Sequence, residues 1–427
     1  MRILAISRAP WRNDNSIGNT FTNLFQDFTD AEIYSLCMRE QPPQNNIALR
    51  NFCISEGQLL RNLLHKTPVG TENTAIDDSG NETEKNIYDK AKKNNSVGLS
   101  LARELLWSVG KWKNENLKAY IKEVNPDIIF FPVFNCFYPH KILKYIKSLT
   151  DAPVILFHAD DNYTLRQFSL SPMYWLYRFM LRKWVRSSVR LSALNYVISD
   201  VQKQDYEKAF RKECKVLTKS ADFATSPAYK TDYNSPLQLV FTGNIGLNRW
   251  KSLAIIAKAL QILNADGVQA QLRIYTGTPL SEKMKSALQI EDTSFIMGSV
   301  PASEIPEIQR EADMLVHVEA FDLHNRLYVR QSFSTKLVDY FKTARPILAV
   351  GPFEVASMAH LIQNDCALTA ETAEELAEKL TAVIAVPENL DVLAQQAYLC
   401  GKNHHDKAKI NKMLREDFAE LINKSDA

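Results

Sequence analysis

The chain has 427 residues, of which 45% are apolar and 23% charged, and its formal net charge is +2. This composition is that of an ordinary globular protein, so it excludes wholesale disorder, a collagen-like chain and a small disulfide scaffold. No stretch reaches the ~20 uninterrupted apolar residues of a membrane span, and the basic excess is too small for a typical nucleic-acid-binding protein. The length predicts two or three domains.

Six cysteines are scattered without any Cys-x-x-Cys spacing, which favours reduced thiols over a disulfide framework. The first residues form an apolar run too short for a signal peptide, and no small-residue cleavage pattern follows. We therefore expect a cytoplasmic protein. The charge is uneven: residues 1–222 have 31 Lys and Arg against 24 Asp and Glu (+7), and the remainder has 20 against 25 (−5). This split indicates that the two halves meet different partners.

Short β-branched runs alternate with longer amphipathic segments, which is typical of βαβ units and parallel sheets. In the first half we expect strands at Arg2–Ile6, Glu32–Ser35, Asp127–Pro132, Val154–His158 and Tyr196–Ser199. The helices expected between them are Leu99–Val124, Tyr138–Leu149, Pro172–Leu191 and Val201–Phe210. The segment Lys66–Ser96 is rich in Asn, Thr, Asp, Glu and Lys and predicts a mobile polar excursion.

A polar, proline-marked stretch at 223–236 predicts a linker to a second run of strands and helices. Strands are expected there at Leu237–Thr242, Gln271–Thr276, Ser294–Met297, Met314–Val318 and Pro346–Val350. Helices are expected at Trp250–Leu263, Ser281–Leu288, Ser303–Glu311, Phe333–Thr343, Glu371–Ile384 and Leu390–Cys400. We therefore expect two α/β domains, 1–222 and 237–405, and a C-terminal helix within 406–427 that returns to the first domain.

The run that joins the strand Leu237–Thr242 to the next helix combines small or polar residues with two cations: Gly243, Asn244, Gly246, Arg249 and Lys251. Glycines allow the backbone to approach a ligand closely, and the free N–H groups at a helix start favour an anion. This run therefore predicts a phosphate site. The alternative is an ordinary strand-to-helix turn with solvated basic residues.

A second run, 331–347, supports the same prediction. Ser334 and Thr335 fall at the positively polarised start of a predicted helix. Lys336 lies in the first turn, where a cation opposes the helix dipole, so an anion bound there would explain its presence. Asp339 lies three residues further on nearly the same face, where a carboxylate can accept hydrogen bonds from ribose hydroxyls. The alternative is a surface Lys–Asp pair.

In their order and spacing, these motifs resemble two-domain GT-B glycosyltransferases of the family 4 type (glycosyl transferases group 1). Ala159-Asp160-Asp161 follows a strand, and Val197-Ile198-Ser199-Asp200 resembles the family's "vi..S" strand end. Residues 215–223 resemble the "vipNGvD" step at the domain link. Three later stretches, 272–277, 298–315 and 334–340, resemble "l.iyG", "G.v….ip.l...aDv.l" and "SxKlxEY".

The chain also departs from the family pattern. The family's paired glutamates, eight positions apart, fall here on Gln331 and Asp339. Asp339 keeps the carboxylate on a side chain shorter by one methylene, whereas Gln331 cannot supply a charge. Lys219-Ser220 replaces the usual Asn-Gly, and Ala344 replaces a glycine. The resemblance is thus to a divergent member.

The resemblance implies an α/β fold of two Rossmann-like, doubly wound domains (GT-B architecture) facing each other across a cleft. The second domain would bind a nucleotide sugar, and Arg249 and Lys251 would act in catalysis by stabilising the leaving nucleoside diphosphate. The implied donor-binding residues are Gly18, Gly243, Asn244, Gly246, Val300, Ser334, Thr335, Lys336 and Asp339. We expect no cofactor and no metal, because such folds generally need no bound metal and the sequence has no DxD strand end or His/Cys cluster.

The first domain would bind the acceptor, in the loop Arg8–Thr20 with its glycine turn and at residues 158–162, where a strand ends. His158 or Asp160 would orient or deprotonate the acceptor hydroxyl. The expected enzyme is a retaining, metal-independent hexosyl- or related glycosyltransferase that acts on a glycan or lipid-linked acceptor in surface polysaccharide or glycoconjugate synthesis. The alternatives are a GT-B-fold nucleotide-sugar 2-epimerase and a non-catalytic nucleotide-sugar-binding protein.

The expected helix Pro172–Leu191 lies in a stretch, 162–199, without any acidic residue. Arg178, Arg182, Arg186 and Arg190 recur on it every four residues and form one stripe. A basic helix with aromatic residues is typical of binding to an anionic membrane surface. We therefore expect peripheral docking on the inner face of the membrane through residues 172–191. The alternative is that the arginines face water.

Overall fold

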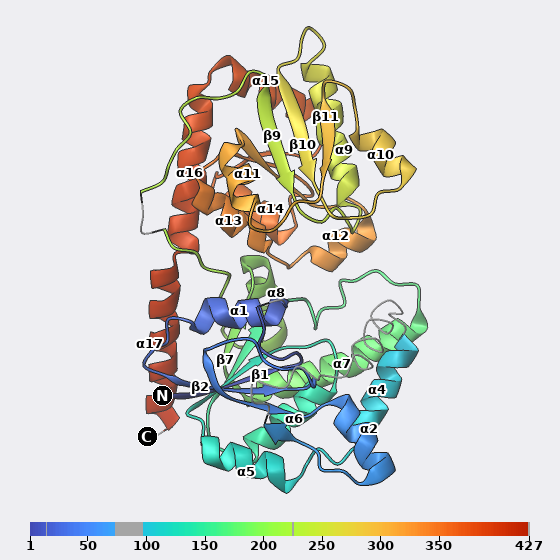
Figure 1. Cartoon of the computed structure of the whole chain (residues 1–427), viewed down its shortest axis with the longest axis vertical. Coiled ribbons are helices and arrows are strands. Elements are labelled where there is room, and N and C mark those ends of the chain that lie inside the picture. The colour runs from blue at the N-terminus through green and yellow to red at the C-terminus, as the bar shows by residue number, and fades with distance from the viewer. Residues whose placement is uncertain (14, 73–96, 224–225, 426–427) are drawn as a thin grey trace. The chain divides into compact units, whose positions relative to one another are not determined.

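The computed structural model describes residues 1–13, 15–72, 97–223 and 226–425, and the chain divides into two compact units (Figure 1). Unit 1 comprises Met1–Leu217 and Asn411–Ala427, and unit 2 comprises Thr218–Ile410. Each unit is an α/β domain with its own hydrophobic core. From residue 73 onward, the polar excursion predicted at Lys66–Ser96 lies outside the described residues.

Unit 1 is built on an eight-stranded sheet of order β4-β3-β2-β1-β5-β6-β7-β8, in which β4 pairs antiparallel and the other described pairs are parallel. Its strands are β1 (Arg2–Ser7), β2 (Glu32–Cys37), β3 (Ala48–Cys53), β4 (Thr71–Glu72), β5 (Ile128–Pro132), β6 (Val154–His158), β7 (Ser192–Val197) and β8 (Lys215–Val216). β5 and β6 are buried throughout, as expected of strands covered by helices on both faces. The strands β3, β4 and β8 were not predicted, because β4 and β8 have only two residues each and β3 has no continuous apolar run.

The helices of unit 1 are α1 (Ser16–Phe25), α2 (Glu56–His65), α4 (Val97–Val109), α5 (Glu115–Val124), α6 (Tyr138–Lys147), α7 (Pro172–Leu191), α8 (Asp200–Phe210) and most of α17 (Lys407–Ser425). The single helix predicted at Leu99–Val124 is wrong, because α4 and α5 are separate. Between them, Trp112 donates its indole N–H to the carbonyl of Trp107 at 2.7 Å. Asn114 then caps α5 by accepting a hydrogen bond from Leu117 N at 3.0 Å.

The glycine turn predicted in the loop Arg8–Thr20 is wrong, because α1 begins within it at Ser16. Asn15 caps this helix by accepting a hydrogen bond from Gly18 N at 2.8 Å. A Cβ atom on Gly18 would lie 1.9 Å from the carbonyl oxygen of Arg12. Gly18 is therefore explained by close packing of the first helical turn against the preceding loop.

Unit 2 contains a parallel six-stranded sheet of order β11-β10-β9-β12-β13-β14. Its strands are β9 (Leu237–Thr242), β10 (Ala270–Tyr275), β11 (Ser294–Gly298), β12 (Met314–Val318), β13 (Ile347–Val350) and β14 (Leu368–Ala370). Its helices are α9 (Arg249–Leu263), α10 (Glu282–Leu288), α11 (Ile305–Glu311), α12 (Leu323–Val329), α13 (Thr335–Thr343), α14 (Ala356–Gln363), α15 (Ala373–Ala385) and α16 (Glu388–His404). The strands and helices predicted here agree to within a few residues, and β14, α12 and α14 were not predicted.

The stretch predicted as a linker, 223–236, is attached to unit 2 by buried charges. The carboxylate of Asp313 lies 2.6 Å from Lys230 Nζ and accepts hydrogen bonds from Asn234. Arg345 donates to the carbonyl of Ala228 at 2.7 Å. Because a buried charge is stable only when it is paired, these contacts fix the described part of the stretch on unit 2.

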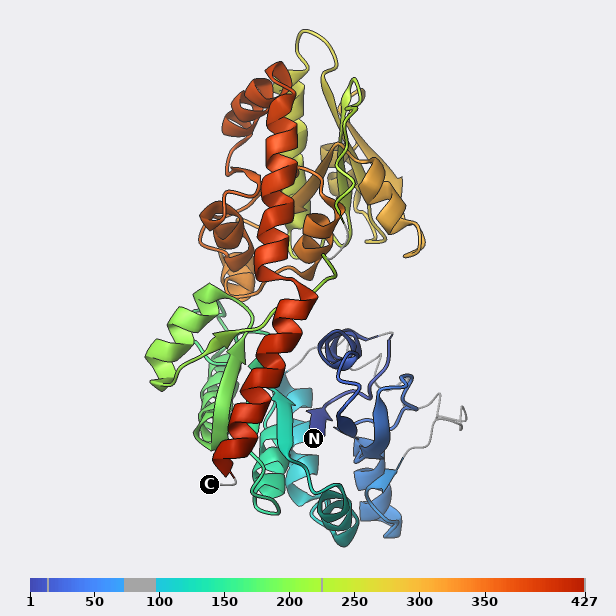
Figure 2. The same cartoon turned by 90° about the vertical axis from the view of Figure 1, so that its left-hand side faces the viewer.

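Helix α17 packs on unit 1 alongside β7 and β8 (Figure 2). Asp417 accepts a hydrogen bond from the hydroxyl of Tyr196 at 2.6 Å and pairs with Lys215 at 2.5 Å. Phe418 is fully buried, 5.8 Å from the ring of Phe28. In the described part of the chain, no helix combines the length and the apolar character needed to cross a bilayer.

Candidate functional site

In unit 2, Gly243 and Lys336 meet where β9 ends. Gly243 has φ = +134°, and a Cβ atom there would lie 2.1 Å from Lys336 Nζ. The ammonium donates a hydrogen bond to the carbonyl of Thr242 at 3.1 Å and lies 5.0 Å from the centre of the Phe241 ring. The lysine from α13 thus occupies the space that the missing side chain leaves, which confirms that the two sequence runs come together.

Lys336 is largely shielded from water, and this disfavours the charged form of its side chain. Burial and the nearby positive charge of Arg249 lower its pKa to about 8, while Glu319 acts in the opposite direction. An anion bound beside this ammonium would restore its ordinary pKa, because it would stabilise the charged form. The geometry is therefore suited to a phosphate.

Arg249 is held by a carboxylate that the sequence analysis did not identify. Its Nε and Nη2 atoms lie 3.1 and 3.0 Å from Oε2 of Glu319, which is buried just after β12. Burial alone would raise the pKa of Glu319, but His317 and Arg249 outweigh it and lower the pKa. Ser252 on α9 donates to the Glu319 carbonyl at 2.6 Å. The position of Glu319 after a buried strand of a parallel sheet was the available signal.

The start of α13 has the polarity predicted from the sequence. The helix begins at Thr335, and Ser334 is its N-cap residue, with its own backbone N–H bonded to Ser357 Oγ at 2.9 Å. The hydroxyl of Ser334 makes no capping hydrogen bond. Because the first N–H groups of a helix lack intrahelical partners, this end can receive an anion beside Lys336.

The other predicted donor residues lie around the same strand ends. Asn244 accepts a hydrogen bond from Gly246 N at 2.6 Å, so this pair shapes the turn before α9. Lys251 is exposed in the first turn of α9, with Nζ 5.9 Å from the centre of the Trp250 ring. Val300 follows β11 and is partly exposed.

Asp339 is paired with Lys219, whose Nζ lies 2.6 Å from its Oδ1. Both side chains are partly exposed. A cavity of about 610 Å³ in unit 2 is lined by Asp339 and, among others, by Ala302, Ile305 and Gln309. Asp339 thus lines this cavity, and its carboxylate is paired with a lysine.

In unit 1, the prediction that His158 meets the acceptor is contradicted by its burial. The imidazole is fully buried at the end of β6, 4.9 Å from the ring of Tyr206 and 3.5 Å from Oδ1 of Asn195. Burial lowers the pKa of His158 to about 3, so the ring is neutral. A side chain without solvent access cannot take a proton from a bound hydroxyl, and we assign His158 to packing.

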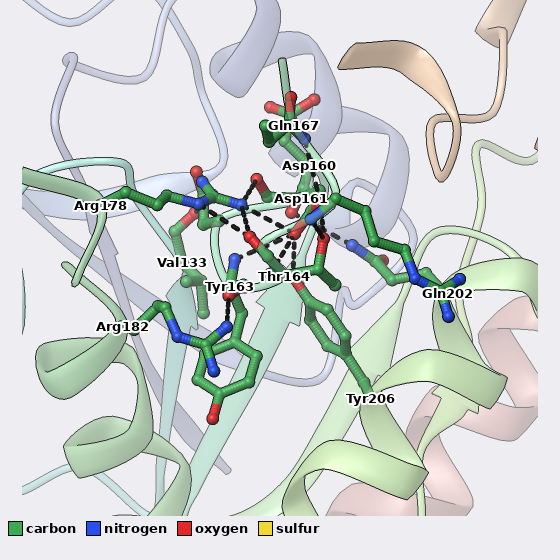
Figure 3. A network of polar contacts seen from close by, with 12 residues as sticks. Val133, Asp160, Asp161, Tyr163, Thr164, Gln167, Arg178, Arg182, Gln202 and Tyr206 are labelled. Atoms are coloured by element: carbon green, nitrogen blue, oxygen red, sulfur yellow. Dashed lines mark hydrogen bonds and ion pairs between the residues drawn. The ribbon is translucent and has the colours of Figure 1, made fainter. Parts of the chain in front are cut away.

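Asp160 differs from His158 because its side chain is exposed at the end of β6 (Figure 3). Crowding by surrounding protein atoms and the negative charge of Asp161 raise its pKa. Its carbonyl accepts a hydrogen bond from Gln202 at 3.1 Å, which fixes the backbone at this point. Asp160 therefore remains a candidate for contact with an acceptor.

Asp161 is the centre of a structural network rather than a reactive group (Figure 3). Its Oδ1 accepts hydrogen bonds from the backbone N–H groups of Tyr163 and Thr164 at 3.0 and 2.7 Å and lies 3.1 Å from Nη2 of Arg178. Burial opposes ionisation of Asp161, but Arg178 and Thr164 outweigh it and lower its pKa. The network holds the loop after β6 and so positions Asp160.

The same network removes two arginines from the predicted stripe. Arg178 is buried and also donates to the carbonyl of Thr164 at 2.8 and 3.0 Å. Arg182 donates to the carbonyl of Tyr163 and lies 4.1 Å from the centre of that ring, and Arg186 reaches the carbonyl of Ala209 at 3.4 Å. Arg178 and Arg182 are turned toward the protein, because the loop after β6 supplies oxygen atoms that a buried cation needs. Arg186 and Arg190 are exposed.

Among the described residues, no group of three or more His, Cys, Asp or Glu side chains is arranged to hold a metal ion. The six cysteines are free thiols and all are buried. The cations near the end of β9, Arg249, Lys251 and Lys336, are the groups that could neutralise an anionic ligand.

Residues 236–385 match the family described as glycosyl transferases group 1. Among solved structures, the chain is similar to Anabaena HepE in complex with UDP, at 13% identity and a TM-score of 0.62, covering 98% of this chain and 100% of that one. It is also similar to sucrose-phosphate synthase from Thermosynechococcus elongatus, at 10% identity and a TM-score of 0.60, covering 99% and 100%. A glycosyltransferase from Rickettsia africae matches at 10% identity and a TM-score of 0.58, covering 99% of each. The curated proteins contain no match to the chain.

Two parallel α/β units, matched over nearly the whole chain by these structures, define the GT-B fold, as predicted. Residues 236–385 thus match the glycosyl transferases group 1 family, and the solved structures share the fold of nearly the whole chain at 10–13% identity. The resemblance inferred from the sequence is thereby confirmed.

Proposed function

We propose that the protein transfers a sugar from a nucleoside-diphosphate-sugar donor bound by unit 2 to a hydroxyl of a glycan or lipid-linked acceptor bound by unit 1. The observation that carries this proposal is the convergence of Gly243, Arg249 and Lys336 beside the open start of α13. Solved structures of HepE contain UDP and UDP-glucose, which supports a nucleoside-diphosphate hexose as the donor. The proposal includes a cytoplasmic location and a role in surface polysaccharide or glycoconjugate synthesis.

In the proposed reaction, the bond between the anomeric carbon and the β-phosphate oxygen breaks while the acceptor oxygen bonds to that carbon. The charge that develops on the leaving diphosphate is met by Arg249, Lys251 and Lys336, because preorganised cations stabilise the transition state more than the ground state. The acceptor proton passes to a leaving phosphate oxygen or to Asp160. We propose that the anomeric configuration is retained, as is typical of the family.

Donor binding is tested first, with a thermal-shift screen of nucleoside diphosphates and their sugars, since a ligand that binds only the folded state raises its stability. The donor found is then incubated with the protein, with and without candidate acceptors, and the products are separated. Transfer to an acceptor supports the proposal. An epimerised nucleotide sugar would identify a 2-epimerase instead, and binding without turnover would identify a non-catalytic protein.

A further inference from the structure

Unit 1 has an apolar surface confined to one layer of helices. Of the large apolar side chains that are exposed in the described part of unit 1, all except Leu49 lie on α2, on α4, or on α7 and the loop before it. Helix α4 packs against both α2 and α7, so the three helices form a continuous layer, seen on the right of unit 1 in Figure 1. We call this surface the α2–α4–α7 face.

Helix α7 contributes the side that faces away from Arg178. Met173, Leu176 and Phe179 recur every three residues, and Leu176 and Phe179 are 54% and 55% exposed. Lys183 follows one turn after Phe179 on the same side and is exposed. Because Arg178 and Arg182 are turned inward, the part of this helix up to Arg182 presents apolar side chains to the solvent, and Arg186 and Arg190 are exposed cations further along.

The neighbouring helices continue the same surface. On α4, Leu105 and Val109 are exposed, four residues apart. On α2, Leu60, Leu63 and Leu64 are exposed on one side, and Leu64 is 76% exposed. A contiguous apolar surface of this kind on a protein unit marks an interaction site, since isolated exposed side chains would be scattered over all elements.

The charges on this layer have one sign. Helices α2, α4 and α7 together contain two carboxylates: Glu56 is partly exposed but pairs with Arg103 at 2.7 Å, and Glu104 is buried. Exposed cations lie at the edges, with Lys66 after α2, Lys111 after α4 and Lys183 on α7. In an anionic lipid surface, the apolar side chains would contact the acyl boundary and the cations would contact the phosphate headgroups.

We propose that the α2–α4–α7 face docks on an anionic lipid bilayer by inserting Leu105, Leu176 and Phe179 among the headgroups. This extends the proposed function, because a lipid-linked acceptor would lie in the same surface, but binding itself requires neither donor nor acceptor. It also replaces the electrostatic stripe expected from the sequence with apolar insertion supported by cations at the edge. Salt should therefore weaken the binding without abolishing it.

The test is cosedimentation of the full chain with phosphatidylcholine vesicles, with and without phosphatidylglycerol, at low and high salt. We expect binding to the anionic vesicles. The combined substitutions Leu105→Ser, Leu176→Ser and Phe179→Ser should lower the bound fraction by about tenfold or more, since apolar area drives insertion. The matched control replaces similarly exposed side chains of unit 2, Ile262→Ser, Val392→Ser and Leu399→Ser, and should bind like the original protein.

Further measurements test whether the variants are folded and whether the cations contribute to binding. Circular dichroism and the melting temperature must be unchanged in both variants, and Lys111→Glu with Lys183→Glu should weaken binding chiefly at low salt. No pelleting with anionic vesicles at low salt, or equal pelleting of the two serine variants, would overturn the proposal. Self-association in lipid-free solution that disappears in the α2–α4–α7 variant would assign the face to a second copy of the chain. Because no sugar transfer is measured, failure here leaves the proposed glycosyltransferase activity to its own test.

Discussion

The ammonium of Lys219 lies 2.6 Å from the carboxylate of Asp339, although the two residues are 120 positions apart. Both depart from the family pattern, which has Asn and Glu at these positions. The shorter carboxylate and the longer, charged partner contact each other directly, so the two departures form one feature of unit 2. If Asp339 binds a ribose, the hydroxyls must share or displace this lysine.

The substitution Lys219→Asn should therefore tighten the binding of a nucleoside diphosphate by no more than about fivefold, because a half-exposed ion pair is worth about 1 kcal/mol or less. Asp339→Asn should weaken binding, since the amide loses the charge-assisted hydrogen bonds to the ribose. Calorimetric titration with UDP measures both. Weaker binding by the Lys219→Asn variant would show instead that Lys219 contacts the ligand.

Lys336 should contribute more to diphosphate binding than other lysines of unit 2. We expect Lys336→Ala to weaken UDP binding by about 10- to 100-fold, the value of a charge-assisted hydrogen bond to phosphate. Lys258→Ala is the matched control, because Lys258 is exposed on α9 and paired with Glu374. Equal affinities of the two variants, measured by calorimetry, would contradict the phosphate site.

Binding should also depend on pH. In the free protein the pKa of Lys336 is lowered to about 8, and a bound diphosphate should raise it, so binding takes up a proton. Affinity should fall by up to about tenfold per unit above pH ~8, until the pKa of the complex is reached. Titrations in buffers of different ionisation enthalpy would detect the proton. The variant Lys336→Met should show no such uptake in this range.

Glu319 should act on the donor site through Arg249 and Lys336. Because Glu319 raises the pKa of Lys336, Glu319→Gln should shift the fall in UDP affinity to lower pH. It should also weaken binding near pH 7, because Arg249 loses the carboxylate that orients it. The control is Glu374→Gln, in the exposed pair with Lys258. A pH profile identical to that of the original protein would show that Glu319 has only a structural role.

Acid should destabilise unit 1 through His140. Burial lowers the pKa of His140 to about 4 from 6.5, and the neutral ring lies 2.7 Å from Ser188 Oγ and 3.1 Å from the Phe134 carbonyl. Below pH 6.5 His140 is protonated in the unfolded chain but stays neutral in the folded chain. The free energy of unfolding therefore falls by about 1.4 kcal/mol per pH unit down to pH ~4.

The variant His140→Gln should thus lose about 2 kcal/mol less between pH 6.5 and 5 than the original protein. Urea denaturation at the two pH values measures this difference. The control is His65→Gln, the same replacement at an exposed histidine on α2. The same acid sensitivity in both variants would exclude His140 as the cause.

Much of the fold could be predicted from the sequence, because it depends on local patterns. Buried parallel strands such as β5 and β6 are continuous apolar runs, and helices such as α7 begin at a proline with a serine cap. Gly243 and Lys336 were both named as candidate site residues from the sequence. A glycine after a strand allows close approach of the backbone, and a lysine in a first helical turn opposes the helix dipole, so both can be noticed without the tertiary structure. The strand β3 was missed because it has no continuous apolar run. The break between α4 and α5 was missed because the contact of Trp112 with Trp107 overrides local propensity there.

The sequence by itself thus determined the α/β class, the order of most elements, the family and the cationic character of the run after β9. Only the tertiary structure decided which charges meet: Glu319 with Arg249, and Arg178 with Asp161. A spacing of four residues places Arg178 and Arg182 on one side of α7, but it does not say whether that side faces protein or water. That choice depends on whether carboxylate and carbonyl oxygens from distant segments compensate the desolvation of each guanidinium, and the loop after β6 supplies them.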